Sequence, residues 1–105
     1  GQPKALESLY VTRRLLRERE SFGLCHDEAS CAHFLHMVLL TYHRTRKLGN
    51  NCHYSVFLAQ RQLYKTYFEN IPVMEKYASL AAALRKGRFR RYVWLCETMW
   101  LGGSL

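Results

Sequence analysis

Apolar residues recur every three to four positions along most of the chain, which is the spacing of an amphipathic α-helix. The clearest apolar stripe contains Val56, Phe57, Leu63, Tyr64 and Phe68. Stripes of this kind predict helices over residues 4–20, 28–48, 52–70, 72–86 and 88–101. The run "YVWLC" has a strand-like composition, but the longer helical period around it prevails. We therefore expect an all-α fold, a compact bundle of about five helices with short loops.

Residues that start or stop helices lie between these stripes. Asp27 is placed to cap the second helix, because its side-chain oxygen can accept a hydrogen bond from an unpaired backbone N–H. Gly49 and Gly87 follow cationic helix ends, where glycine can take the left-handed backbone that closes a helix. Pro72 fits the first turn of the fourth helix. We expect a single helical domain over residues 1–105, which could be a piece of a longer protein.

The segment "ASLAAALRKGRFRRYVWLC" resembles one hairpin of PCI-type and tetratricopeptide-like helical repeats. In such hairpins a helix of small residues ends in Leu-x-x-Gly, and an aromatic residue opens the next helix. Here these positions are Leu84, Gly87 and Phe89. The resemblance covers about a fifth of the chain and implies a helical scaffold that docks partners.

The charge is strongly positive and unevenly distributed. Sixteen Lys and Arg residues stand against eight Asp and Glu residues, for a net charge of +8. No acidic residue occurs between Glu28 and Glu69. Such a field attracts phosphate backbones, anionic headgroups or acidic protein segments. No apolar run approaches the length of a membrane span, and the start of the chain shows no signal-peptide pattern. We therefore expect an intracellular protein, in the nucleus or the cytoplasm.

Two groups of cations lie at predicted helix ends, where folding does not demand them. Like charges this close repel one another, so an anionic partner would relieve the cost. Gly87 forces a turn within the second group, so its side chains should fan out around a corner. We expect both groups to converge into one patch of positive potential: Arg44, Arg46 and Lys47 with Arg85, Lys86, Arg88, Arg90 and Arg91.

Trp94 follows the second group but falls outside the apolar stripe of its helix. If exposed beside the cations, it would offer a stacking platform for an unpaired base. The alternative, which we slightly favour, is that Trp94 packs on the first helix.

Two classes of partner fit this pattern. The first is nucleic acid, with RNA or single strands favoured over duplex DNA, because no helix-turn-helix pattern is convincing. The second is an acidic or amphipathic protein segment docked in a groove between helices, with arginines at the rim and an aromatic anchor. The many aromatic residues also leave room for a homodimer.

Cysteine and histidine residues cluster in "CHDEASCAHFLH". Zinc would need four such donors, and the set available is Cys25, Cys31, His36 and Cys52. Their spacing matches no standard site, so we expect no metal or other cofactor. Four cysteines also allow three disulfide pairings, but without a secretion signal we expect reduced thiols.

Motifs of enzyme chemistry are missing from the sequence. It contains no glycine-rich phosphate loop, and its eight acidic residues provide no paired-carboxylate site. Cys52 and His53 are adjacent, but neighbouring positions of a helix point apart. We therefore expect no catalytic residues and a protein that binds rather than catalyses.

Overall fold

The computed structural model describes residues 6–48 and 50–101, which form five α-helices and no strand. The helices are α1 (Glu7–Ser21), α2 (Glu28–Thr45), α3 (Asn50–Tyr67), α4 (Ala78–Lys86) and α5 (Phe89–Leu101). Two short 3-10 helices, η2 (Arg46–Leu48) and η3 (Glu75–Tyr77), follow α2 and precede α4. The predicted all-α bundle of about five helices is confirmed.

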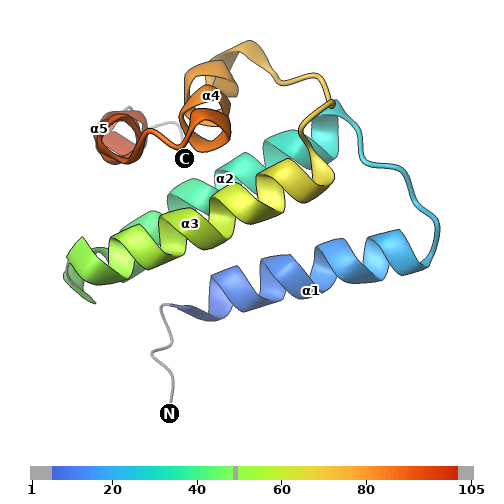
Figure 1. Cartoon of the computed structure of the whole chain (residues 1–105), viewed down its shortest axis with the longest axis horizontal. Coiled ribbons are helices and arrows are strands. Elements are labelled where there is room, and N and C mark those ends of the chain that lie inside the picture. Colours follow the sequence, from blue (N-terminus) through green and yellow to red (C-terminus); the bar gives the residue numbers. More distant parts are fainter. Residues whose placement is uncertain (1–5, 49, 102–105) are drawn as a thin grey trace.

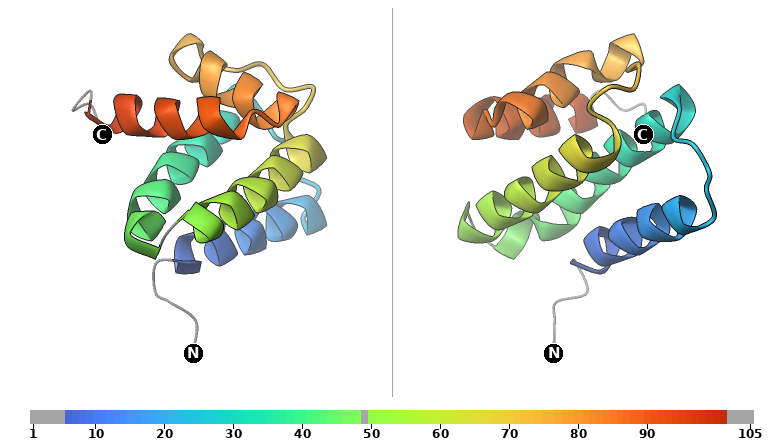
Figure 2. Two further views of the ribbon diagram at one scale, coloured as in Figure 1. Left: turned by 60° about the vertical axis from the view of Figure 1, so that its left-hand side comes forward. Right: turned by 45° about the vertical axis from the view of Figure 1, so that its right-hand side comes forward.

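The helices are arranged around a central pair (Figure 1). Helices α2 and α3 lie side by side, α1 covers one side of the pair, and the α4–α5 hairpin covers the other. In the left view of Figure 2, α5 crosses over both central helices. The described chain measures 37 × 35 × 25 Å along its principal axes. This arrangement separates α1 from the α4–α5 hairpin by the thickness of the central pair.

Local signals set most helix ends. Asp27 caps α2 as predicted: the Ser30 backbone N–H donates to Asp27 Oδ1 at 2.9 Å, and the Asp27 backbone N–H donates to Ser30 Oγ at 2.8 Å. Helix α1 ends at Ser21, and Gly23 follows with a left-handed φ of 72°. The Leu24 backbone N–H donates to the carbonyl oxygen of Arg19, which satisfies an otherwise unpaired group at the end of α1.

Some predicted boundaries are wrong by several residues. Pro72 lies outside any helix, because Met74 takes an extended backbone with ψ of 141° and the chain enters η3 only at Glu75. Helix α4 therefore begins six residues later than predicted. Helix α3 runs two residues earlier at its start and three earlier at its end than the predicted 52–70. Residues 1–5, including the predicted helix start at Lys4, and the predicted stop at Gly49 lie outside the described residues.

Aromatic side chains within the hydrophobic core join α2, α3 and α5. Phe57 contacts Tyr92 with ring centroids 4.8 Å apart, and Phe34 contacts Phe68 at 5.1 Å. These four side chains are almost fully buried. Burying one large apolar side chain is worth about 1.5–3 kcal/mol, so these rings hold the α4–α5 hairpin and α2 onto α3. Cys96 is fully buried in the same core, as a small apolar residue would be.

Candidate nucleic-acid interface

The turn between α4 and α5 is fixed by the backbone. Gly87 takes a left-handed φ of 71°, and its N–H donates to the carbonyl oxygen of Leu84 at 3.2 Å. The Arg88 N–H donates to the carbonyl oxygen of Ala83 at 2.9 Å. These bonds close α4 at the predicted residue and start α5 at once. The sequence on both sides of the glycine is cationic, so the turn becomes a charged corner.

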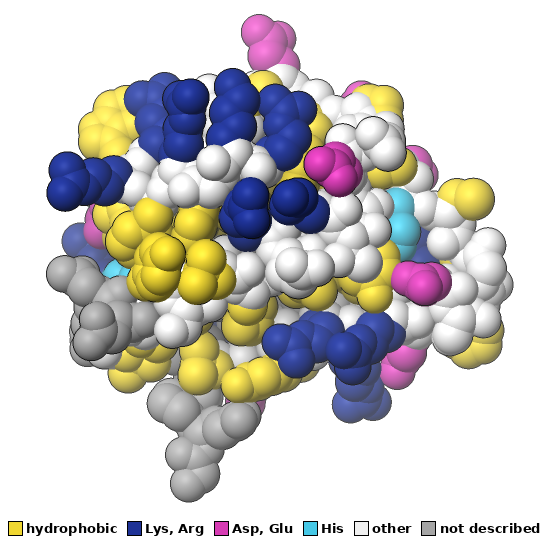
Figure 3. Space-filling model, in the orientation of Figure 1, with side chains coloured by type: hydrophobic (Ala, Val, Ile, Leu, Met, Phe, Trp, Pro, Cys, Tyr) yellow, Lys and Arg dark blue, Asp and Glu magenta, His cyan; other side chains and the backbone are white. Residues whose placement is uncertain are grey.

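Five cations surround this turn, and all are exposed. We call them the basic corner: Arg85, Lys86, Arg88, Arg90 and Arg91. None of them forms an ion pair with an acidic residue of the described chain. In the orientation of Figure 1, Lys and Arg side chains form a row over the α4–α5 layer, with a separate group over α1 (Figure 3). The basic corner is therefore a group of exposed cations without acidic partners in the described chain.

Arg61 of α3 joins the basic corner, although the sequence did not single it out. Its Nη2 donates to the carbonyl oxygen of Arg85 at 3.4 Å. Its Nε lies 3.1 Å from the position that a Cβ would occupy on Gly87. The only sequence signal for Arg61 was its place in the long window without acidic residues. Its role follows from the packing of α3 beneath the turn.

Trp94 is exposed, and the prediction that it packs on the first helix is wrong. Its exposed fraction is 56%. Helix α1 lies across the central pair from α5, so it cannot cover this ring. Instead, the Arg91 guanidinium lies over the ring, with Cζ 5.0 Å from the centroid. Such a pair is worth about 0.5–1 kcal/mol at an exposed site and keeps the ring beside the cations.

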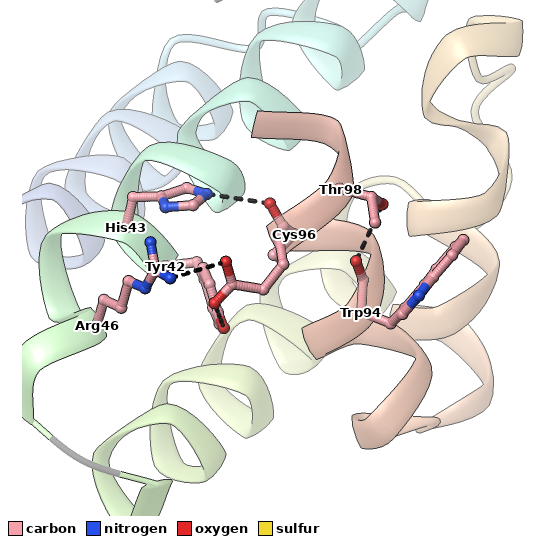
Figure 4. Close-up of polar contacts among 7 residues, drawn as sticks. Tyr42, His43, Arg46, Trp94, Cys96 and Thr98 are labelled. Carbon is pink, nitrogen blue, oxygen red and sulfur yellow. Dashed lines mark hydrogen bonds and ion pairs between the residues drawn. The ribbon is translucent and has the colours of Figure 1, made fainter. Parts of the chain in front are cut away.

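The cations at the end of α2 bind within the fold (Figure 4). Arg46 Nη2 lies 3.3 Å from Glu97 Oε2, and the Tyr42 hydroxyl donates to Glu97 Oε1 at 2.8 Å. The His43 Nε2 is 3.0 Å from the carbonyl oxygen of Cys96. Burial is the main cause that raises the pKa of Tyr42, and the hydrogen bond to Glu97 is the next, so the hydroxyl remains a donor. These contacts fasten the end of α2 to α5.

The contacts therefore do not bring Arg44 and Arg46 together with Arg91, which lies over the Trp94 ring. Figure 4 shows Arg46 and His43 on one side of α5, and Trp94 pointing away from them. Arg44 Nη1 donates to Ser8 Oγ at 3.4 Å and so belongs with α1. The side chain of Lys47 lies outside the described residues. We restrict the candidate interface to the basic corner, Arg61 and Trp94.

The four zinc candidates named from the sequence do not form a metal-binding group among the described residues. No group of three or more His, Cys, Asp or Glu residues suited to a metal occurs among residues 6–48 and 50–101. Cys25 is exposed in the α1–α2 connection, whereas Cys31 is buried in the first turn of α2. Burial raises the pKa of the Cys31 thiol to about 11 and that of the Cys96 thiol further. All four cysteines are unpaired thiols.

A second surface feature is an apolar groove between α1 and α2, which the sequence did not reveal. It encloses about 680 Å³ and is lined by Leu15, Phe22, Leu24, Phe34 and Met37, among others. Leu15, Phe22 and Leu24 are more than half exposed. In the sequence, the signals for this groove were Leu15, an apolar residue outside the stripe of α1, and Phe22 and Leu24 in the connection that follows α1.

Comparison with models of protein families, with curated proteins and with solved structures gives no match. The resemblance to PCI-type and tetratricopeptide-like hairpins therefore depends on the α4–α5 residues alone. Within the described part of the chain, no helix has both the length and the apolar composition needed to cross a membrane.

Proposed function

We propose that this protein is a non-enzymatic binding module that holds RNA through the basic corner. The observation that carries the proposal is a set of five exposed cations without acidic partners, beside an exposed tryptophan. Their mutual repulsion costs stability, and a phosphate backbone would remove that cost while releasing its own counterions. Four of the five are arginines, whose planar guanidinium groups suit phosphate oxygens. RNA occurs in the nucleus and the cytoplasm, so we propose an intracellular location.

The salt dependence of RNA binding can be predicted from the number of phosphate contacts. Each phosphate contact to a single strand lowers the logarithm of the affinity by about 0.7 per decade of salt. If all five cations of the basic corner make such contacts, raising the salt from 50 to 200 mM should weaken binding about 100-fold. A partner bound mainly by apolar contacts would respond far less.

The test is fluorescence anisotropy of a labelled single-stranded RNA at these two salt concentrations. The variant Arg88→Gln, Arg90→Gln, Arg91→Gln should bind much more weakly and lose only about 7-fold over the same salt step. Its melting temperature should be unchanged or higher, because the repulsion in the corner is reduced. The matched control is Arg13→Gln, Arg14→Gln, Arg17→Gln, which removes the same charge from α1.

Equal losses in the two triple variants would mean that binding follows net charge and not the corner, and the proposal would be wrong. An absence of RNA binding at 50 mM salt would also contradict it. That outcome would favour the other partner class, an acidic or amphipathic protein segment, for which the groove between α1 and α2 is the available inter-helix surface.

A further inference from the structure

Three cations of the basic corner line one hollow between α4 and α5. Its α4 wall consists of Ser79, Ala82, Ala83 and Lys86, and its α5 wall of Arg88 and Arg91. The α4 positions are spaced i, i+3, i+4 and i+7, so they share a helix face. Small side chains along this face leave the space open, and the hollow measures about 170 Å³. Three long cationic side chains therefore surround a floor of methyl groups and one hydroxyl.

The hollow is suited to an anion. Lys86, Arg88 and Arg91 are exposed and unpaired, so their N–H donors are free for a ligand. Ser79 can add a hydroxyl donor. The hollow opens beside the first turn of α5, where the helix dipole adds positive potential. A tetrahedral phosphate offers several acceptor oxygens, which matches donors that converge from two walls.

Arg91 connects this hollow to Trp94. It lines the hollow and also covers the tryptophan ring, with Cζ 5.0 Å from the centroid. Arg91 of the hollow and the exposed Trp94 side chain are therefore neighbours on α5. A nucleotide has a matching layout, because one sugar links its phosphate to its base.

We infer that the hollow and Trp94 form a subsite for one nucleotide unit of a single-stranded nucleic acid, with the backbone phosphate in the hollow and the base stacked on Trp94. This inference rests on the proposed function. Bases of a duplex are stacked within the helix and offer no free face, so the subsite selects single strands. Stacking is sequence-tolerant because every base has a π-face.

The first experiment replaces the ring. Trp94→Leu should weaken binding of a single-stranded RNA by about 5- to 150-fold and leave binding of the matching duplex unchanged. The matched control is Tyr10→Leu, because Tyr10 is also an exposed aromatic residue beside an arginine. Its ring centroid lies 5.7 Å from Arg13 Cζ. This control lies on α1 and should leave RNA affinity unchanged.

The second experiment separates the phosphate from the base. In a Trp100→Phe background, Trp94 is the only tryptophan, and RNA should quench its fluorescence. An abasic oligomer with the same number of phosphates should bind more weakly and leave the fluorescence unchanged. Lys86→Gln, Arg88→Gln, Arg91→Gln should lower the salt slope by about 0.7 with the normal RNA, because the three cations share one phosphate.

The outcomes distinguish this inference from the proposed function. If RNA binds with a steep salt dependence but Trp94→Leu binds as tightly as Tyr10→Leu, the subsite is wrong and the proposed function stands. Equal affinity for the abasic and normal oligomers would overturn the subsite in the same way. If no RNA or duplex binds at 50 mM salt, both the function and the subsite are wrong.

Discussion

A buried hydrogen bond between α3 and α5 gives the sharpest test of the fold. The Tyr92 hydroxyl donates to Gln60 Oε1 at 2.6 Å, and both side chains are at most 2% exposed. Gln60 Nε2 makes only a long contact of 3.5 Å to the carbonyl oxygen of Val38. The Cys96 thiol also adjoins the Tyr92 hydroxyl, but a thiol is a weak partner. The bond is therefore the main polar link inside an apolar core.

Replacing one partner should cost more than replacing both. Gln60→Leu leaves the Tyr92 hydroxyl with only the weak Cys96 thiol as a partner where water cannot reach it, which costs about 1–3 kcal/mol of unfolding free energy. Tyr92→Phe leaves the Gln60 oxygen unpaired and should cost a similar amount. The double variant has neither unpaired group, so its cost should be lower than the sum of the single costs by about 1 kcal/mol or more.

The assay is urea unfolding of the four proteins, followed by far-ultraviolet circular dichroism. The dependence of the free energy on urea should be the same in all four, since the surface exposed on unfolding barely changes. A loss of 2 kcal/mol should lower the melting temperature by about 10 °C in a domain of this size. Strictly additive single costs would refute the reasoning, because they would mean that the two groups do not depend on each other in the native core.

Gly87→Ala should destabilise the protein by about 1–2 kcal/mol in urea unfolding, and by more than Gly23→Ala. Both glycines have a left-handed φ, but only a Cβ added at Gly87 meets another side chain, with Arg61 Nε at 3.1 Å. Equal losses of stability in the two variants would contradict a role for this contact. In thiol labelling of the native protein, Cys25 should react first and the buried Cys96 only after unfolding. Burial is the main cause that lowers the pKa of His53 below the usual value for histidine, so the native state favours neutral imidazole. The contribution of His53 to stability should therefore be full above the pKa of an unfolded histidine and decline on acidification, and His53→Phe should lessen that decline in urea unfolding at pH 5 and 7.

Much of the fold was accessible from the sequence, because its signals are local. The stripe of α3 predicted which residues are buried, and Asp27 and Gly87 predicted a helix start and a helix end that the structure confirms. The start of α4 was not accessible. Pro72 is compatible with a first helical turn, but residues 72–74 are not helical and the 3-10 helix η3 precedes α4.

Some features of the candidate site could likewise be predicted from the sequence, and others could not. The sequence placed five cations around a glycine turn, and their exposure follows from charge and from the lack of acidic neighbours. It could not show that Arg46 would pair with Glu97, since the two residues lie far apart in the chain. Nor could it show that Arg61 would lie beneath Gly87, or that α1 would be too distant to cover Trp94.

By itself, then, the sequence determined the five helices, most of their ends and the charge that each one carries. These depend on periodicity, capping and composition, which act over a few residues. The tertiary structure alone decided which cations are neutralised, which aromatic ring is exposed, and which side chains share a hollow. Those outcomes depend on how the helices pack, and side-chain contacts between distant helices leave no mark in local spacing.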